Sequence, residues 1–211
     1  MEGYRNVKNV IFDFGGVILE IDYSKTEKAL GSLMKRGDHA GFSQAEQSEL
    51  FNGIETGLLS VAEFRDGLRA LCERQTLSDE SLDNAWNALL GPLIPEALEL
   101  IKDVVENRRV FLLSNTNKIY IDRVNEGILR DLGSVAAFES VFERVYYSHE
   151  LGMRKPDKEI FQLVLDENAL KPEETLFIDD SRQHILGAEV LGFQTLHLTK
   201  PLVECEFLMG K

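Results

Sequence analysis

Cysteine and proline are scarce in this chain of 211 residues. The two cysteines, Cys72 and Cys205, are too few for a disulfide framework or a zinc site, so we expect free thiols in a reducing cytoplasm. Five prolines and 16 glycines are also too few for a fibrous or disordered chain. The composition therefore predicts an ordinary folded protein.

Basic residues are in short supply as well. The chain has 23 Lys and Arg residues against 36 Asp and Glu residues, which leaves a net charge of −13. Such a charge repels polyanions, so we expect neither nucleic acid nor an anionic membrane as a partner. No apolar run approaches the ~18 residues of a membrane span, and residues 1–9 lack the hydrophobic stretch of a signal peptide. We expect the chain to be cytoplasmic.

Short apolar runs alternate with helical patterns along most of the chain. The runs have the Val, Ile and aromatic content of buried strands, and they span Val7–Phe14, Arg109–Leu113, Val141–Tyr147, Thr175–Ile178 and Gln194–Leu198. Apolar residues at helical spacing lie between the later runs, over Pro95–Val105, Pro156–Leu165 and Ser181–Leu191. This alternation predicts an α/β fold in which helices cover both faces of a parallel sheet.

The segment between the first strand and Pro92 differs, because it contains helical patterns and no strand-like run. Its four helices are marked by apolar periodicity over residues 23–36 and 82–90 and by the capping-box pairs Ser43/Glu46 and Ser60/Glu63. We therefore expect a small all-helical domain, residues 21–92, inserted into an α/β domain of residues 1–20 and 93–211. Trp86 is expected in the core of the insert.

Acidic residues stand where two of the predicted strands end. Asp13 ends the first strand, and Asp179 and Asp180 end the fourth. The carboxyl ends of parallel strands lie at one edge of a sheet, so these side chains can meet. Acids brought so close need a cation to offset their repulsion, and oxygen ligands of this kind suit Mg²⁺.

Polar residues follow the other strands at the same edge. Ser114 and Asn115 come after the second strand, where a hydroxyl and turn amides can bind phosphate oxygens. Lys155 lies between Gly152 and Pro156, which shape its loop so that the cation points inward. Each residue alone is explained by a turn, a helix cap or a solvated charge. Their ordered appearance at strand ends favours a site that attacks phosphorus with a carboxylate.

Several other polar residues have no predicted catalytic role. Asp22 and Tyr23 lie where the first strand passes into the insert and could face a substrate. The histidines lack the spacing of a metal site or a catalytic triad, so we expect them at the surface or partly buried. They are His39, His149, His184 and His197.

Four motifs, in this order, resemble the haloacid dehalogenase (HAD) superfamily of hydrolases. They are residues 11–17 (IFDFGGV), 112–115 (LLSN), 154–156 (RKP) and 177–181 (FIDDS). Residues 114–117 and 151–156 more narrowly resemble the bacterial phosphatases that include alpha-D-glucose-1-phosphate phosphatase. The resemblance implies a Rossmann-like core with a helical cap inserted after the first strand.

The resemblance also implies a role for each motif residue. Asp13 would be the nucleophile that forms an aspartyl-phosphate. Ser114 and Asn115 would hold the phosphoryl group, and Lys155 would pair with both the phosphoryl group and Asp13. The catalytic residues would thus be Asp13, Lys155 and Ser114.

The implied metal site holds Mg²⁺ with Asp13, Asp179, Asp180 and the backbone carbonyl of Gly15. In most phosphatases of this superfamily the residue two positions after the nucleophile is a second Asp, which moves protons; here it is Gly15. Such proton transfer typically contributes 10²–10⁴-fold. We therefore expect a slower enzyme, or one for easier leaving groups such as the anomeric oxygen of a sugar.

The sequence thus predicts a Mg²⁺-dependent phosphatase, a monomer or weak homodimer, that acts on a small phosphorylated metabolite. A sugar phosphate such as glucose 1-phosphate is the expected substrate. Two alternatives remain open. A metal-independent dehalogenase would have no use for Asp179 and Asp180. A catalytically weak, phosphate-binding regulatory protein would explain Gly15, but not the retention of Asp13 and Lys155.

Overall fold

A five-stranded parallel sheet forms the centre of the molecule. The computed structural model describes residues 4, 6–34 and 48–205. The strands are β1 (Asn9–Phe12), β4 (Arg109–Ser114), β5 (Arg144–Tyr147), β6 (Thr175–Asp179) and β7 (Gln194–His197), in the order β5-β4-β1-β6-β7. The five predicted strands and the α/β fold are confirmed.

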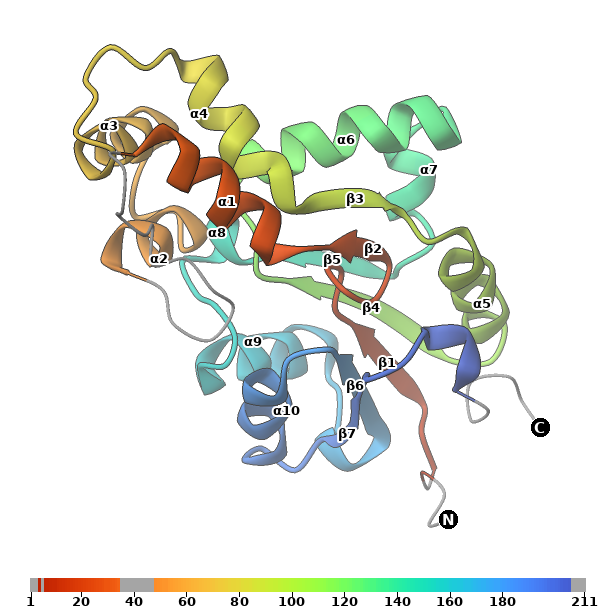
Figure 1. The fold of residues 1–211 in the computed structure, drawn as a ribbon. Coiled ribbons are helices and arrows are strands. Elements are labelled where there is room, and N and C mark those ends of the chain that lie inside the picture. The colour runs from red at the N-terminus through yellow and green to blue at the C-terminus, as the bar shows by residue number, and fades with distance from the viewer. Residues whose placement is uncertain (1–3, 5, 35–47, 206–211) are drawn as a thin grey trace.

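Helices cover both faces of this sheet (Figure 1). Val10 and Phe12 of β1 pack on the side of α5 (Pro95–Val105), α6 (Lys118–Leu132) and α7 (Val135–Glu139), whereas Ile11 packs on the side of α9 (Lys158–Asn168) and α10 (Arg182–Glu189). Burial on both faces explains why β1 is apolar without alternation. The helical patterns in the sequence did not predict α6 or α7, and α9 begins at Lys158 rather than at Pro156.

Within the described residues, four helices lie between β1 and α5. They are α1 (Tyr23–Leu33), α2 (Glu49–Glu55), α3 (Val61–Leu71) and α4 (Asp79–Trp86). Their apolar faces share a core in which Trp86 is fully buried, as expected. The predicted capping box of Ser60 and Glu63 is present at the start of α3. The predicted pair Ser43/Glu46 lies outside the described residues.

Two short strands connect these helices to the rest of the fold, which corrects the expectation that the segment before Pro92 has no strand. β2 (Leu19–Ile21) and β3 (Leu90–Leu93) pair in antiparallel fashion before α1 and after η1 (Asn87–Leu89). β3 contains Gly91 and Pro92, residues that disfavour strands, so its pairing with β2 comes from tertiary structure rather than from local propensity. We call residues 22–89 the insert.

The remaining elements are short. They are α8 (Ser148–Leu151), η2 (Pro172–Glu174) and η3 (Leu202–Glu204). Cys72 and Cys205 are free and buried. Among the described residues, no helix has the length and apolar character needed to cross a bilayer.

Candidate active site

The carboxyl ends of three neighbouring strands bring together the polar residues predicted there. Asp13 directly follows β1, Ser114 ends β4 and Asp179 ends β6. The Asp13 backbone N–H donates to the carbonyl of Ile178 at 2.9 Å, which fixes the nucleophile candidate beside the end of β6. All three side chains are almost fully buried.

Lys155 is the centre of this cluster and is completely buried. Its Nζ donates to Asp13 Oδ1 at 2.7 Å, to Asp179 Oδ2 at 2.7 Å and to the carbonyl of Leu113 at 2.9 Å. An ammonium group has three donors, so all of them are used. The prediction that the loop aims this cation inward agrees with its position, and Gly152 ends α8 with a φ of 68°, a value that suits glycine.

Both polar atoms of the Asn115 side chain bind the backbone of Lys155. Its Oδ1 accepts from the Lys155 backbone N–H at 2.8 Å, and its Nδ2 donates to the Lys155 carbonyl at 2.8 Å. This contact positions the Lys155 loop, a role in addition to the phosphoryl binding that the resemblance implies for Asn115. Ser114 Oγ has only a long contact of 3.5 Å, to the Asn115 carbonyl, and Ser114 lines the cavity described below.

The pKa values of the two central acids, Asp13 and Asp179, are shifted in opposite directions. Burial, together with the negative charges of Asp179 and Asp180, raises the pKa of Asp13 to about 8. Burial also disfavours ionisation of Asp179, but Lys155 and His184 outweigh it and lower the pKa of that carboxyl to about 2. One ammonium therefore faces three carboxyl groups, and the cluster has more acid than it can neutralise by itself.

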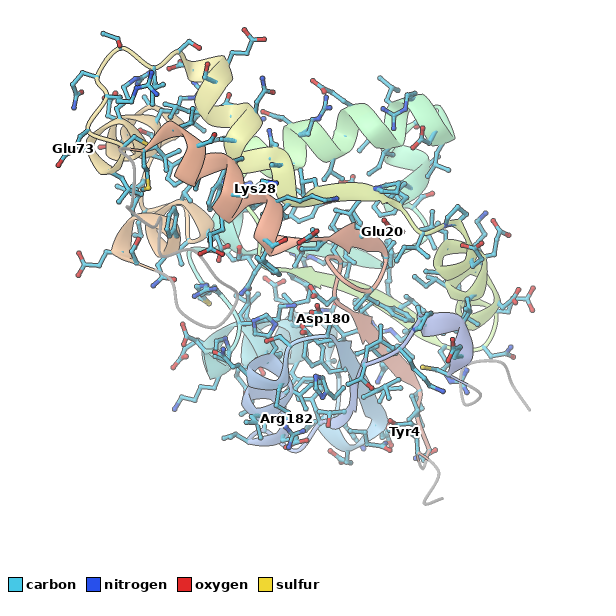
Figure 2. The ribbon with its side chains drawn as sticks, viewed as in Figure 1. Tyr4, Glu20, Lys28, Glu73, Asp180 and Arg182 are labelled. Carbon is cyan, nitrogen blue, oxygen red and sulfur yellow. The ribbon has the colours of Figure 1, made fainter. Side chains whose placement is uncertain are left out.

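The donor set fits a small divalent cation. Asp13 and Asp179 each offer a carboxylate oxygen within 4.8 Å of the other's, and Asp180 is close enough to raise the pKa of Asp13. In Figure 2, Asp180 lies at the boundary between the sheet and the insert. A Cβ at Gly16 would collide with the Asp180 carboxylate, so glycine leaves room for that carboxylate against the turn after β1. The excess negative charge and oxygen ligands suit Mg²⁺.

His184 is part of the cluster, although it was expected to have no role in a site. Its Nδ1 lies 2.9 Å from Asp179 Oδ2 and 3.0 Å from Oδ1, and its side chain is buried. The Ser181 backbone N–H also donates to Asp179 Oδ1, at 2.7 Å. The spacing of five residues between Asp179 and His184, across a strand end and the first turn of α10, is the only sequence signal for this contact.

A cavity of about 60 Å³ lies between this cluster and the insert. The core contributes Asp13, Gly15, Ser114 and His184 to its walls, among others. Tyr23, Glu55, Leu89 and Leu90 are among the residues that line it from the insert and from β3. The suggestion that Tyr23 could face a substrate agrees with this position. Asp22 instead caps the N-terminus of α1 and is not among the residues that line the cavity.

The arrangement defines a hydrolase site in which a strand-end carboxylate lies beside a buried lysine, under a helical insert. The model of the family described as haloacid dehalogenase-like hydrolases matches residues 7–192, and the chain therefore belongs to this family. The family membership that the four motifs suggested is thus confirmed.

Named relatives of the chain include phosphatases. D-ribitol-5-phosphate phosphatase from Bacteroides thetaiotaomicron is 33% identical over 189 residues, which cover 90% of both chains. A phosphorylated carbohydrates phosphatase from Thermotoga maritima is 24% identical over 196 residues, covering 89% of this chain and 83% of the relative.

A solved structure confirms the fold. A HAD family enzyme from Bacteroides thetaiotaomicron, an aspartate-to-alanine variant in complex with magnesium and inorganic phosphate, superposes with a TM-score of 0.84. It is 31% identical, and the match covers 94% of this chain and 98% of that one.

Proposed function

We propose that this chain is a Mg²⁺-dependent phosphatase for a small phosphorylated metabolite, a sugar or polyol phosphate. The observation that carries the proposal is the contact of 2.7 Å between Asp13 Oδ1 and the buried Nζ of Lys155, beside Ser114 and at the cavity between the core and the insert. Relatives that act on ribitol 5-phosphate and on phosphorylated carbohydrates support the substrate class. Glucose 1-phosphate, with its good leaving oxygen, is one member of it.

The reaction takes place in two displacements at phosphorus. An Asp13 oxygen forms a bond to phosphorus while the bond to the ester oxygen breaks, and the ester oxygen leaves as an alcohol after taking a proton from solvent water. A water molecule then attacks the phosphorus of the aspartyl-phosphate and gives up a proton to solvent, which releases inorganic phosphate and restores the Asp13 carboxylate. Lys155 and the Ser114 hydroxyl stabilise the phosphoryl oxygens, and Asn115 keeps the Lys155 backbone in place.

Mg²⁺ would be held by Asp13, Asp179 and Asp180, with the Gly15 carbonyl as a further oxygen. When bound, it neutralises the negative charge that builds up on the phosphoryl group. The magnesium complex of the relative from Bacteroides thetaiotaomicron supports this assignment. His184 fixes the orientation of the Asp179 carboxylate, as outer residues around metal sites commonly do.

The insert would act as the cap. Small-molecule pockets usually have volumes of roughly 300–1,000 Å³, and the cavity here has about 60 Å³. The insert must therefore move away from the core to admit a sugar phosphate and return to exclude water. We propose a monomer or weak homodimer, because all of the proposed groups come from one chain.

Hydrolysis assays test the proposal. Release of phosphate would be measured from p-nitrophenyl phosphate and a panel of sugar and polyol phosphates, with Mg²⁺ or with EDTA, beside Asp13→Asn. We expect activity that requires both Mg²⁺ and Asp13. Turnover of 2-chloropropionate in EDTA, with none of the phosphate esters, would support a dehalogenase instead, and phosphate binding without any turnover would support a regulatory protein.

A further inference from the structure

Glu55 and Tyr120 are among the polar side chains that line the cavity outside the phosphate site. Glu55 is the last residue of α2 in the insert, and Tyr120 lies in the first turn of α6. Both line the same cavity as Asp13 and Ser114, and both are more than nine-tenths buried. Neither has a role in the chemistry at phosphorus.

The hydroxyl of Tyr120 has no hydrogen-bond partner among the described residues. The ring cannot swing to find one, because it stacks on Trp86 with a centroid distance of 4.9 Å and an angle of 9°. Trp86 in turn stacks on Phe51 at 5.2 Å. A buried polar group without a partner is rare in folded proteins and commonly marks a place where a ligand or water binds.

The carboxylate of Glu55 is held in a fixed position. Its Oε2 lies 2.9 Å from Nη2 of Arg154, whose Nη1 donates to Asn52 Oδ1 at 2.7 Å. The Glu55 carbonyl accepts from Ser148 Oγ at 2.7 Å. Because Arg154 directly precedes Lys155, the same loop positions both the Glu55 carboxylate and the lysine of the phosphate site.

The two groups have complementary hydrogen-bonding capacity. Burial, and then the negative charge of Glu55, raise the pKa of Tyr120 well above 10, so its hydroxyl stays protonated and can donate. A carboxylate only accepts. Together they can bind hydroxyl groups as both donor and acceptor, and the Glu55 charge disfavours a second anionic group. Leu89, Leu90 and Val124 are among the apolar residues of the same wall.

We propose that Tyr120 and Glu55 form a hydroxyl-recognising subsite for the leaving group, which selects a neutral polyhydroxylated chain over an apolar or a second anionic one. This inference rests on the proposed function, in which Asp13 receives the phosphoryl group at the other end of the cavity. Because the insert supplies Glu55 and supports the Tyr120 ring, the subsite is complete only when the insert lies against the core.

The test compares ribitol 5-phosphate with pentyl phosphate, which has the same carbon chain without hydroxyls. In Tyr120→Phe we expect the ratio of kcat/KM for the two substrates to fall by about 10-fold, as for loss of one hydrogen bond in a buried site. Tyr146→Phe is the matched control, because Tyr146 is also a buried residue but its hydroxyl accepts a hydrogen bond from Asn168, beside the opposite core cluster. It should keep the wild-type ratio.

A second pair of substrates tests the carboxylate. In Glu55→Gln we expect the kcat/KM for fructose 1,6-bisphosphate, relative to fructose 6-phosphate, to rise by about 10-fold, because a negative charge is gone and the positive charge of Arg154 is left without its partner. Tyr120→Phe should not lower the melting temperature, since its hydroxyl has no partner to lose. In an Asp13→Asn background, the additional change Tyr120→Phe should weaken the affinity for ribitol 5-phosphate and leave the affinity for inorganic phosphate unchanged.

The outcomes separate this inference from the proposed function. If the wild-type protein hydrolyses no phosphate ester, or Asp13→Asn keeps full activity, the proposed function fails and the subsite with it. If the wild-type protein is an Asp13-dependent phosphatase and Tyr120→Phe changes the rates for both five-carbon substrates equally, the subsite alone is overturned. An unchanged bisphosphate preference in Glu55→Gln would likewise overturn the role of the carboxylate.

Discussion

Replacing Lys155 by methionine isolates the charge of the only cation at the centre of the described acid cluster. Methionine has a similar length but no ammonium, so it fills most of the same space, while the ion pairs to Asp13 and Asp179 and the contact of Nζ with the face of the Phe177 ring are lost. The side chain is fully buried, so water cannot replace the missing donors without a change in the structure.

The expected cost is large. Removing one partner of a buried ion pair typically costs about 3–5 kcal/mol, because the other partner stays buried and uncompensated. The Leu113 carbonyl also loses its donor, which adds roughly 1–3 kcal/mol if nothing replaces it. Protonation of Asp13 relieves part of this repulsion, so we expect a net loss of about 3–5 kcal/mol in the free energy of unfolding at neutral pH.

Urea unfolding followed by circular dichroism, in EDTA and in Mg²⁺, gives the measurement. Mg²⁺ should stabilise Lys155→Met more than it stabilises the wild-type protein, because the variant has one more uncompensated negative charge. Lys118→Met is a control: this lysine pairs with Asp122 at the surface and its loss should cost less than 1 kcal/mol. A Lys155→Met variant within 1 kcal/mol of the wild-type protein in EDTA would refute the buried charge cluster.

Three further predictions concern the turn after β1 and the proposed metal site. The folded-state pKa of Asp13, about 8, lies above its ordinary value of 3.8, so in EDTA the native state holds a proton that the unfolded state has lost. Stability should therefore fall as pH rises from about 4 to about 8, and Mg²⁺ should stabilise more at pH 8 than at pH 5; equal stabilisation in thermal melts at both values would contradict this. Gly16→Ala should weaken Mg²⁺ binding by about 10–100-fold in calorimetry, because the residue has a φ of 74° and its Cβ would displace the Asp180 carboxylate; unchanged affinity would exclude Asp180 as a ligand. Gly15→Asp should fold, since its Cβ meets only the flexible Ile21 side chain at 3.0 Å, and should raise turnover of alkyl phosphates by about 10-fold or more; a collapse of activity would show that the backbone needs glycine there.

The sheet and the central acids could be predicted because their signals are local. Each strand is a short apolar run, and Asp13 and Asp179 stand at the ends of two of them, so strand topology alone brings these residues together. The same reasoning failed for β3, where Gly91 and Pro92 give no strand signal and the pairing depends on β2.

Other parts of the site depend on contacts between distant segments, and the sequence does not show them. Asn115 was predicted to hold the phosphoryl group, but no sequence signal indicated that its side chain also binds the Lys155 backbone, 40 positions away. In the sequence, His184 is one of four scattered histidines. Its contact with Asp179 depends on the turn after β6. The role of Glu55 could not be predicted, because its position at the cavity requires the insert to be docked on the core.

The stack of Phe51, Trp86 and Tyr120 joins the insert to the first turn of α6. Trp86 is the only tryptophan in the chain, so the intrinsic fluorescence of the protein reports from this one boundary. Separation of the two parts would pull the indole from its aromatic neighbours into water and shift its emission to longer wavelength. Trp86 is thus an intrinsic fluorescent probe of the movement of the insert away from the core. Stopped-flow mixing with phosphate can follow that movement without any added label.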